Sequence, residues 1–172
     1  MENKQAESIL KIYTACAKPL YAVLENIPEA QLNWQPNTDS RSIGQMMRHL
    51  IRVDNWFLKR LDFEPEIEDP GEASTPAILA ALQGVHQQII SILKAIRDDA
   101  ELARKSSAPD AKSHETLAGI MIHISQHYLY HLAQMIYLRR AQDREWKSPM
   151  KQWEAATHII SDELAVIKNV ES

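Results

Sequence analysis

Two histidines stand four residues apart in the stretch HYLYH, and imidazoles with this spacing can hold a metal ion. They are His127 and His131. Residues four apart in an α-helix lie about one turn apart on the same face, so both rings can reach a single ion. Such pairs are also common in helices that bind no metal. The spacing therefore needs support from its surroundings.

The register of the surrounding segment gives that support. Apolar residues recur at helical spacing, and three polar residues occupy the same register; the full set is Leu117, Ile120, Ile124, His127, His131, Gln134 and Leu138. A polar side chain that faces a core costs free energy unless a partner satisfies it. The partner is either a metal ion or a set of hydrogen bonds in a polar core, and both hypotheses stay open at this point.

A third histidine supports the metal hypothesis. His49 lies beside Met46 and Val53, at the edge of the apolar face of another helical segment. If the two segments pack side by side, His49 can meet the pair at one end of a bundle. Three imidazoles suit a divalent ion such as Zn, Ni, Fe or Mn, and three protein ligands leave a position for water or substrate.

Three other polar residues have two interpretations each. Asp54 could orient a ligand or accept a proton, or it could be solvated on its helix face. Gln134 could orient a ligand histidine or satisfy a neighbour in the core. Cys16, the only cysteine, lies on an apolar stripe, so we expect a buried thiol rather than a nucleophile.

The remaining histidines are weaker candidates. His123 is one position off the core register, so we expect it at the rim or on the surface. His86 borders an apolar face, where a hydrogen-bonded histidine is more common than a ligand. His114 and His158 are assigned no role. The chain has no HExxH motif, no Glu-x-x-His motif and no glycine-rich phosphate loop, which excludes three common kinds of site.

Helices must position these residues, because no strand pattern or hairpin turn stands out. Helical periodicity appears in five segments: roughly residues 3–27, from after NTDSRS to about Leu61, from Thr75-Pro76 to about Asp99, from about Ser113 to Arg140, and from near Ser148-Pro149. Long amphipathic helices of this kind predict an all-α four-helix bundle with an additional short C-terminal helix. The connections are long enough to allow either alternating or up-down-down-up order.

Composition limits the class of protein. The chain has 172 residues, which suits one domain spanning residues 1–172. The net charge of −4 gives no basic surplus, so we expect no nucleic-acid partner. Uninterrupted apolar runs are short and no signal-peptide pattern appears, so we expect no membrane span and a cytoplasmic location. The acidic stretch 64–72 is expected to be a solvated, mobile loop.

Two stretches resemble signatures of DinB-like proteins. In WQPNTDSRSIGQMMRHLIRVDNWF the matching residues are Trp34, Pro36, Ser42, Ile43, Gly44, His49, Leu50, Asp54 and Trp56. In HYLYHLAQMIYLRR they are His127, His131, Gln134, Leu138 and Arg139. The sequence departs from the family at Leu132-Ala133, where Arg-Gly is frequent, and His123 is an added histidine.

The resemblance implies a four-helix bundle with a divalent-metal site formed by His49, His127 and His131. It also implies a metal-dependent enzyme of the thiol S-transferase type, with a small-molecule substrate and a low-molecular-weight thiol, and it implies a homodimer. A non-enzymatic metal-binding stress-response protein and a metal-dependent hydrolase are the alternatives. Neither the metal nor the reaction follows from the sequence.

Overall fold

The structure is a computed structural model that describes residues 3–169, and within this range every regular element is helical. The elements are α1 (Lys4–Leu24), α2 (Glu29–Asn33), α3 (Ile43–Arg60), α4 (Thr75–Ala95), the 3-10 helix η1 (Asp99–Ala103), α5 (Leu117–Gln142) and α6 (Met150–Asn169). An isolated bridge between Lys105 and Thr116 is the only β-type pairing in the described part. The all-α fold class is confirmed.

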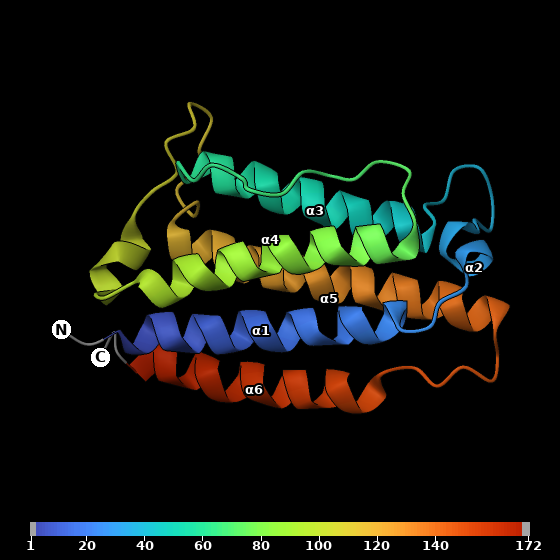
Figure 1. The fold of residues 1–172 in the computed structure, drawn as a ribbon. Helices are drawn as coiled ribbons and strands as arrows, with labels where there is room; N and C mark the ends of the chain where they lie inside the picture. The colour runs from blue at the N-terminus through green and yellow to red at the C-terminus, as the bar shows by residue number, and fades with distance from the viewer. Residues whose placement is uncertain (1–2, 170–172) are drawn as a thin grey trace.

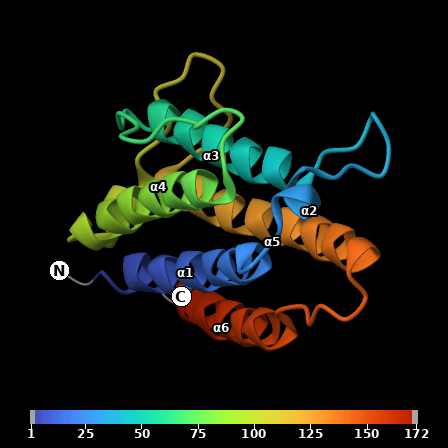
Figure 2. The ribbon, with the colours of Figure 1, turned by 45° about the vertical axis from the view of Figure 1, so that its right-hand side comes forward.

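Helices α1, α3, α4 and α5 form the bundle, and α6 packs along the outer side of α1 (Figures 1 and 2). Figure 1 shows that α1 and α5 run in one direction, whereas α3 and α4 both run in the other. The order is therefore up-down-down-up. The connection between α3 and α4 returns along the length of the bundle, which explains why it is long.

The helix starts follow from local hydrogen bonds. Ser42 caps α3: its hydroxyl accepts from the N–H of Gln45 at 3.2 Å, and the Gln45 side chain accepts from the Ser42 N–H at 3.0 Å. Helix α4 begins at Thr75 with Pro76 in its first turn, and the Ser74 side chain at the N-cap position makes no capping hydrogen bond. Helix α5 begins after Thr116, later than expected, because the Thr116 hydroxyl accepts from the Gly119 N–H at 3.1 Å.

Two elements differ from the expectation. The C-terminal helix is not short, because α6 has 20 residues, about as many as α1 with 21. It is fixed to α1 through Glu163, whose carboxylate accepts from the Ser8 hydroxyl at 2.7 Å and from the Lys11 ammonium at 2.8 Å. The five-residue helix α2 was not expected, because such a short segment shows no periodicity.

The acidic connection between α3 and α4 is bound to both helices. Asp69 pairs with Arg48 at 3.0 Å and with Arg52 at 2.6 Å. On the other side, the Gln88 amide donates to the backbone oxygen of Glu64 at 2.7 Å. A mobile, solvated loop was expected here instead. The sequence did not indicate these contacts, because residues 64–72 are separated in the chain from their partners on α3 and α4.

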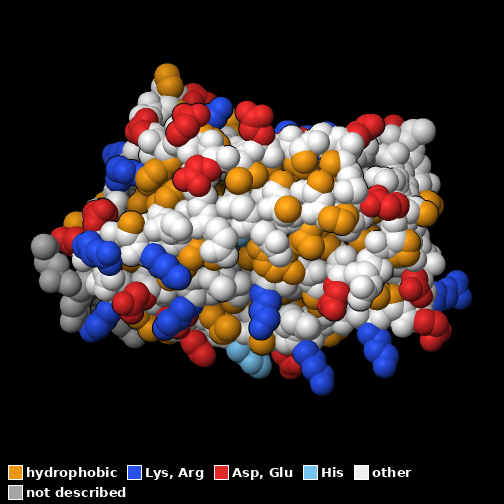
Figure 3. Space-filling model, viewed as in Figure 1, with side chains coloured by type: hydrophobic (Ala, Val, Ile, Leu, Met, Phe, Trp, Pro, Cys, Tyr) orange, Lys and Arg blue, Asp and Glu red, His pale blue; other side chains and the backbone are white. Residues whose placement is uncertain are grey.

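Helix α4 is the one described helix that is long and apolar enough to cross a membrane by length and composition. Its apolar stripe, from Ile78 to Leu93, is buried in the bundle core, and a core helix has the same composition. Its outer side is visible in Figure 3 as a band that is poor in charged side chains.

Candidate metal centre

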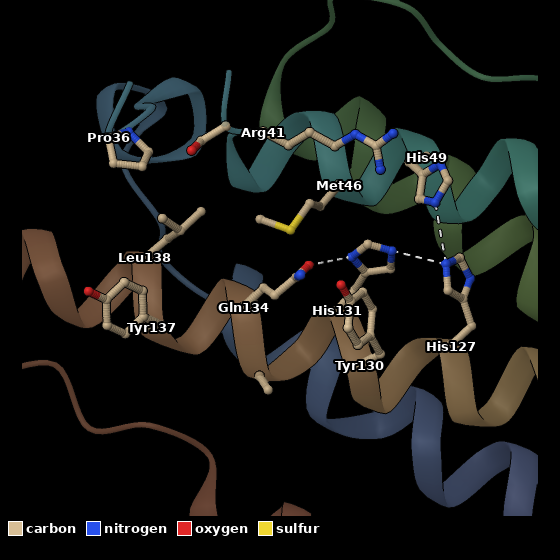
Figure 4. Close-up of a pocket in the computed structure, with 12 residues that line it drawn as sticks. Pro36, Arg41, Met46, His49, His127, Tyr130, His131, Gln134, Tyr137 and Leu138 are labelled. Atoms are coloured by element: carbon tan, nitrogen blue, oxygen red, sulfur yellow. Dashed lines mark hydrogen bonds between the residues drawn. The ribbon is translucent and has the colours of Figure 1, made fainter. Parts of the chain in front are cut away.

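Helices α3 and α5 bring three imidazoles together beside a pocket. His49 comes from α3, and His127 and His131 lie one turn apart on α5 (Figure 4). The Nε2 atom of His127 lies 3.3 Å from Nε2 of His49 and 3.0 Å from Nε2 of His131. The sequence predicted this same set of three residues, and the structure places them in one cluster.

The cluster has the donor chemistry of a divalent-metal site. One ligand nitrogen from each ring can be chosen so that all three lie within 4.8 Å of one another. Neutral imidazoles offer one lone pair each, and lone pairs that face one another at this distance repel unless a proton or a cation lies between them. Borderline metal ions such as Zn and Ni favour such nitrogen ligands, so the residues fit a divalent ion.

Gln134 determines the orientation of His131. Its amide oxygen lies 2.8 Å from the Nδ1 atom of His131. An amide oxygen only accepts, so Nδ1 carries the proton and Nε2 keeps its lone pair for a ligand. This contact serves both interpretations given for Gln134, because His131 is at once a candidate ligand and a buried neighbour.

The environment keeps the three rings neutral. Burial, with a smaller contribution from the positive charge of Arg41, lowers the pKa of His49 to about 4. Burial also lowers the pKa of His127 to about 4, with contributions from the neighbouring rings of His131 and His49. Burial is also the main cause that lowers the pKa of His131. Neutral imidazoles are the form that binds metal.

A pocket of about 770 Å³ opens beside the three rings. Its lining residues are Pro36, Ser40, Arg41, Met46, His49, His127, Tyr130, His131, Ala133, Gln134, Tyr137 and Leu138. The lining contains no Asp or Glu, and its volume suits a small molecule. Figure 4 shows the histidines at one end of the pocket and Tyr137, Leu138 and Pro36 toward the other.

Asp54 lies elsewhere. It does not line the pocket, and its side chain is fully buried in the bundle, where it accepts a hydrogen bond from the hydroxyl of Tyr128. Its second oxygen has no hydrogen-bond partner. Burial raises the pKa of Asp54 to about 8. The structure therefore places this carboxyl behind the site instead of on a solvated helix face, and the raised pKa favours its protonated form at neutral pH.

The other histidines and the cysteine lie outside the cluster. His123 is exposed at the rim, as predicted, with its ring centroid 6.3 Å from that of His127. His86 is fully buried, deeper than the core edge expected for it, and bonds the Tyr21 hydroxyl. Cys16 is buried, as predicted, and its burial raises its thiol pKa to about 12.

Tyr130, Tyr137 and Arg41 line the pocket but were not predicted from the sequence. Tyr130 and Tyr137 share the histidine face of α5, because they lie three residues after His127 and three after Gln134, and this spacing could have indicated them. Arg41 precedes the cap of α3 in a loop. No helical spacing could have linked it to the site.

One of three comparisons with known proteins identifies a family. A sequence model described as the DinB superfamily matches residues 13–135, which is more than half of the chain and includes all three clustered histidines. Neither the comparison with curated proteins nor that with solved structures found a match.

Proposed function

The chain belongs to the DinB superfamily, and from this premise we propose that it holds one divalent metal ion and acts as a metal-dependent thiol S-transferase. The ligands are His49, His127 and His131, and the ion is Zn, Ni, Fe or Mn. The observation that carries the proposal is the convergence of three Nε2 atoms at the end of a small-molecule pocket.

The protein residues have distinct tasks in this proposal. The three imidazoles bind the ion, and Gln134 holds His131 in the tautomer that can ligate. A bound divalent ion would lower the pKa of a thiol and so raise the fraction of thiolate, the nucleophilic form. The pocket walls would hold the electrophilic small molecule against that thiol.

The pocket composition favours thiol transfer over the hydrolase alternative. Hydrolysis at a metal site commonly uses a carboxylate as general base, but no Asp or Glu lines this pocket. Asp54, the nearest candidate in the sequence, is buried behind the site. Attack by a thiolate needs no such base once the thiol has lost its proton.

Metal content tests the first half of the proposal. We expect about one divalent ion per chain in protein purified without a histidine tag, by elemental analysis. The His49→Ala variant should lose most of the metal, because only two of the three proposed ligands remain. The matched control is His158→Ala, on the exposed surface of α6, which should keep the metal. Equal metal content in the two variants overturns the site.

Conjugation of small thiols to an electrophile tests the second half. The wild-type protein should accelerate the reaction, and both His131→Ala and a chelator should abolish the acceleration. Cys16→Ser should retain it, because that thiol is buried and protonated. Full metal content with no activity toward any of several thiols would instead support the non-enzymatic stress-response alternative.

A further inference from the structure

An arginine lines the same pocket and faces the histidine cluster. Figure 4 shows the Arg41 side chain extending along α3 until its guanidinium lies beside His49. Besides burial, which is the main cause, the charge of Arg41 lowers the pKa of all three clustered histidines. A ligand that binds next to the histidine cluster therefore also lies near this cation.

Arg41 has no ion-pair partner among the described residues. The two other arginines near the start of α3 differ in this respect, because Arg48 and Arg52 both pair with Asp69. A guanidinium that is free and directed into a pocket keeps its full set of donors for a ligand.

The charge balance of the pocket indicates the sign of that ligand. The lining contains a cationic side chain and three neutral imidazoles but no carboxylate, within a chain whose net charge is −4. A divalent ion would add further positive charge. Such a site favours an anion, and a guanidinium pairs best with a planar carboxylate through two parallel hydrogen bonds.

We propose that the substrate of this site is a small carboxylate-bearing thiol, with its carboxylate on Arg41 and its sulfur directed toward the three histidines. The inference rests on the proposed function for the position of the sulfur. The side chain of Met46 and the ring of Tyr130 also line the pocket, where they would contact the carbon chain of the ligand.

Two thiols that differ only in charge provide the test. Zinc-loaded protein is titrated calorimetrically with 3-mercaptopropionate and with its neutral amide, 3-mercaptopropionamide. We expect the wild-type protein to bind the acid about tenfold more tightly, because only the acid makes a charge-assisted pair. Arg41→Gln should bind both with the affinity of the amide, and Arg41→Lys should keep part of the preference.

The control variant is Arg140→Gln, which removes an exposed arginine that does not line the pocket and should keep the full preference. Elemental analysis of every sample separates the two proposals. If zinc is bound but the acid has no advantage, or if the advantage survives in Arg41→Gln, the substrate inference is wrong and the metal site stands. If no zinc binds, the proposed function fails and this inference fails with it.

Discussion

Asp54 is the residue whose environment differs most from that of an ordinary carboxylate. It is fully buried between helices, bonded to the Tyr128 hydroxyl, and has one oxygen without a partner. A charged carboxylate would be costly there, so burial raises its pKa to about 8. Because Tyr128 follows His127 directly, this contact joins α3 to α5 immediately behind the histidine cluster.

The raised pKa makes a contribution to stability that depends on pH. An unfolded Asp titrates near pH 3.9, so between about pH 4 and 8 folding takes up a proton. The contribution of the protonated Asp54 is complete below about pH 4 and is lost as the pH rises toward 8. Wild-type protein should therefore lose stability relative to Asp54→Asn as the pH rises through this range.

Urea unfolding of chelator-treated protein at several pH values measures this difference. Burial lowers the pKa of His86 to about 3, so this histidine also makes the stability depend on pH. Its effect is the same in wild type and in Asp54→Asn, and it cancels when the two proteins are compared. Asp162→Asn, on the exposed side of α6, is the control and should show no such trend. A difference between wild type and Asp54→Asn that stays constant with pH would show that the carboxyl is charged in the fold.

The sequence predicted some of these residues and could not predict others. The histidine cluster was predictable because His127 and His131 occupy core register, where a polar residue is conspicuous, and His49 borders an apolar face. Burial of Asp54 was not predictable, because it depends on which helix packs against that face of α3. Arg41 could not be predicted either, because it lies in a loop, and the loop conformation determines where its side chain extends.

At the scale of the elements, Arg139 links the end of α5 to the end of α1. Its guanidinium donates to the backbone oxygens of Val23 and Glu25, the latter at 2.9 Å, and lies 4.4 Å from the ring centroid of Trp146. The last carbonyls of a helix lack partners within the helix, and α1 has no basic residue in its last turn. Arg139 supplies that partner from a neighbouring helix.

We expect Arg139→Met to lower the free energy of unfolding by about 1.5–3 kcal/mol, because hydrogen bonds from a charged group to buried acceptors are lost. Methionine keeps much of the apolar stem, so packing changes little. Arg140→Met removes the exposed neighbour and should cost far less. Urea unfolding compares the two variants, and equal losses would contradict a role of Arg139 in ending α1.

Periodicity predicted the long helices but not their neighbours in space. Helix α2 illustrates the limit: it packs on α3 at Gly44, where a Cβ atom would lie 3.2 Å from Cγ of Leu32. That close approach explains why a glycine suits the start of α3. A stripe of apolar residues shows that a helix has a buried face, but not which helix covers it, so the up-down-down-up order stayed open.

At the scale of the whole molecule, α4 has an unusual outer side. No Asp, Glu, Lys or Arg occurs between Thr75 and Leu93, although 24% of the chain is charged. Its exposed positions include Ala80, Gln83 and Gln87, and Figure 3 shows few charges over this helix. Charged residues are depleted at the centres of protein interfaces. We therefore expect a homodimer in which this side of α4 meets a second copy.

Light scattering during gel filtration tests the dimer. Wild-type protein should have about twice the 19.7 kDa of one chain at micromolar concentration. The double variant Gln83→Lys, Gln87→Lys should shift it to the mass of one chain, because a two-fold contact brings like charges together and buries them. Gln152→Lys, on the exposed side of α6, should leave the dimer intact. A double variant that stays dimeric would move the interface away from α4, and a wild-type protein with the mass of one chain would exclude the dimer at that concentration.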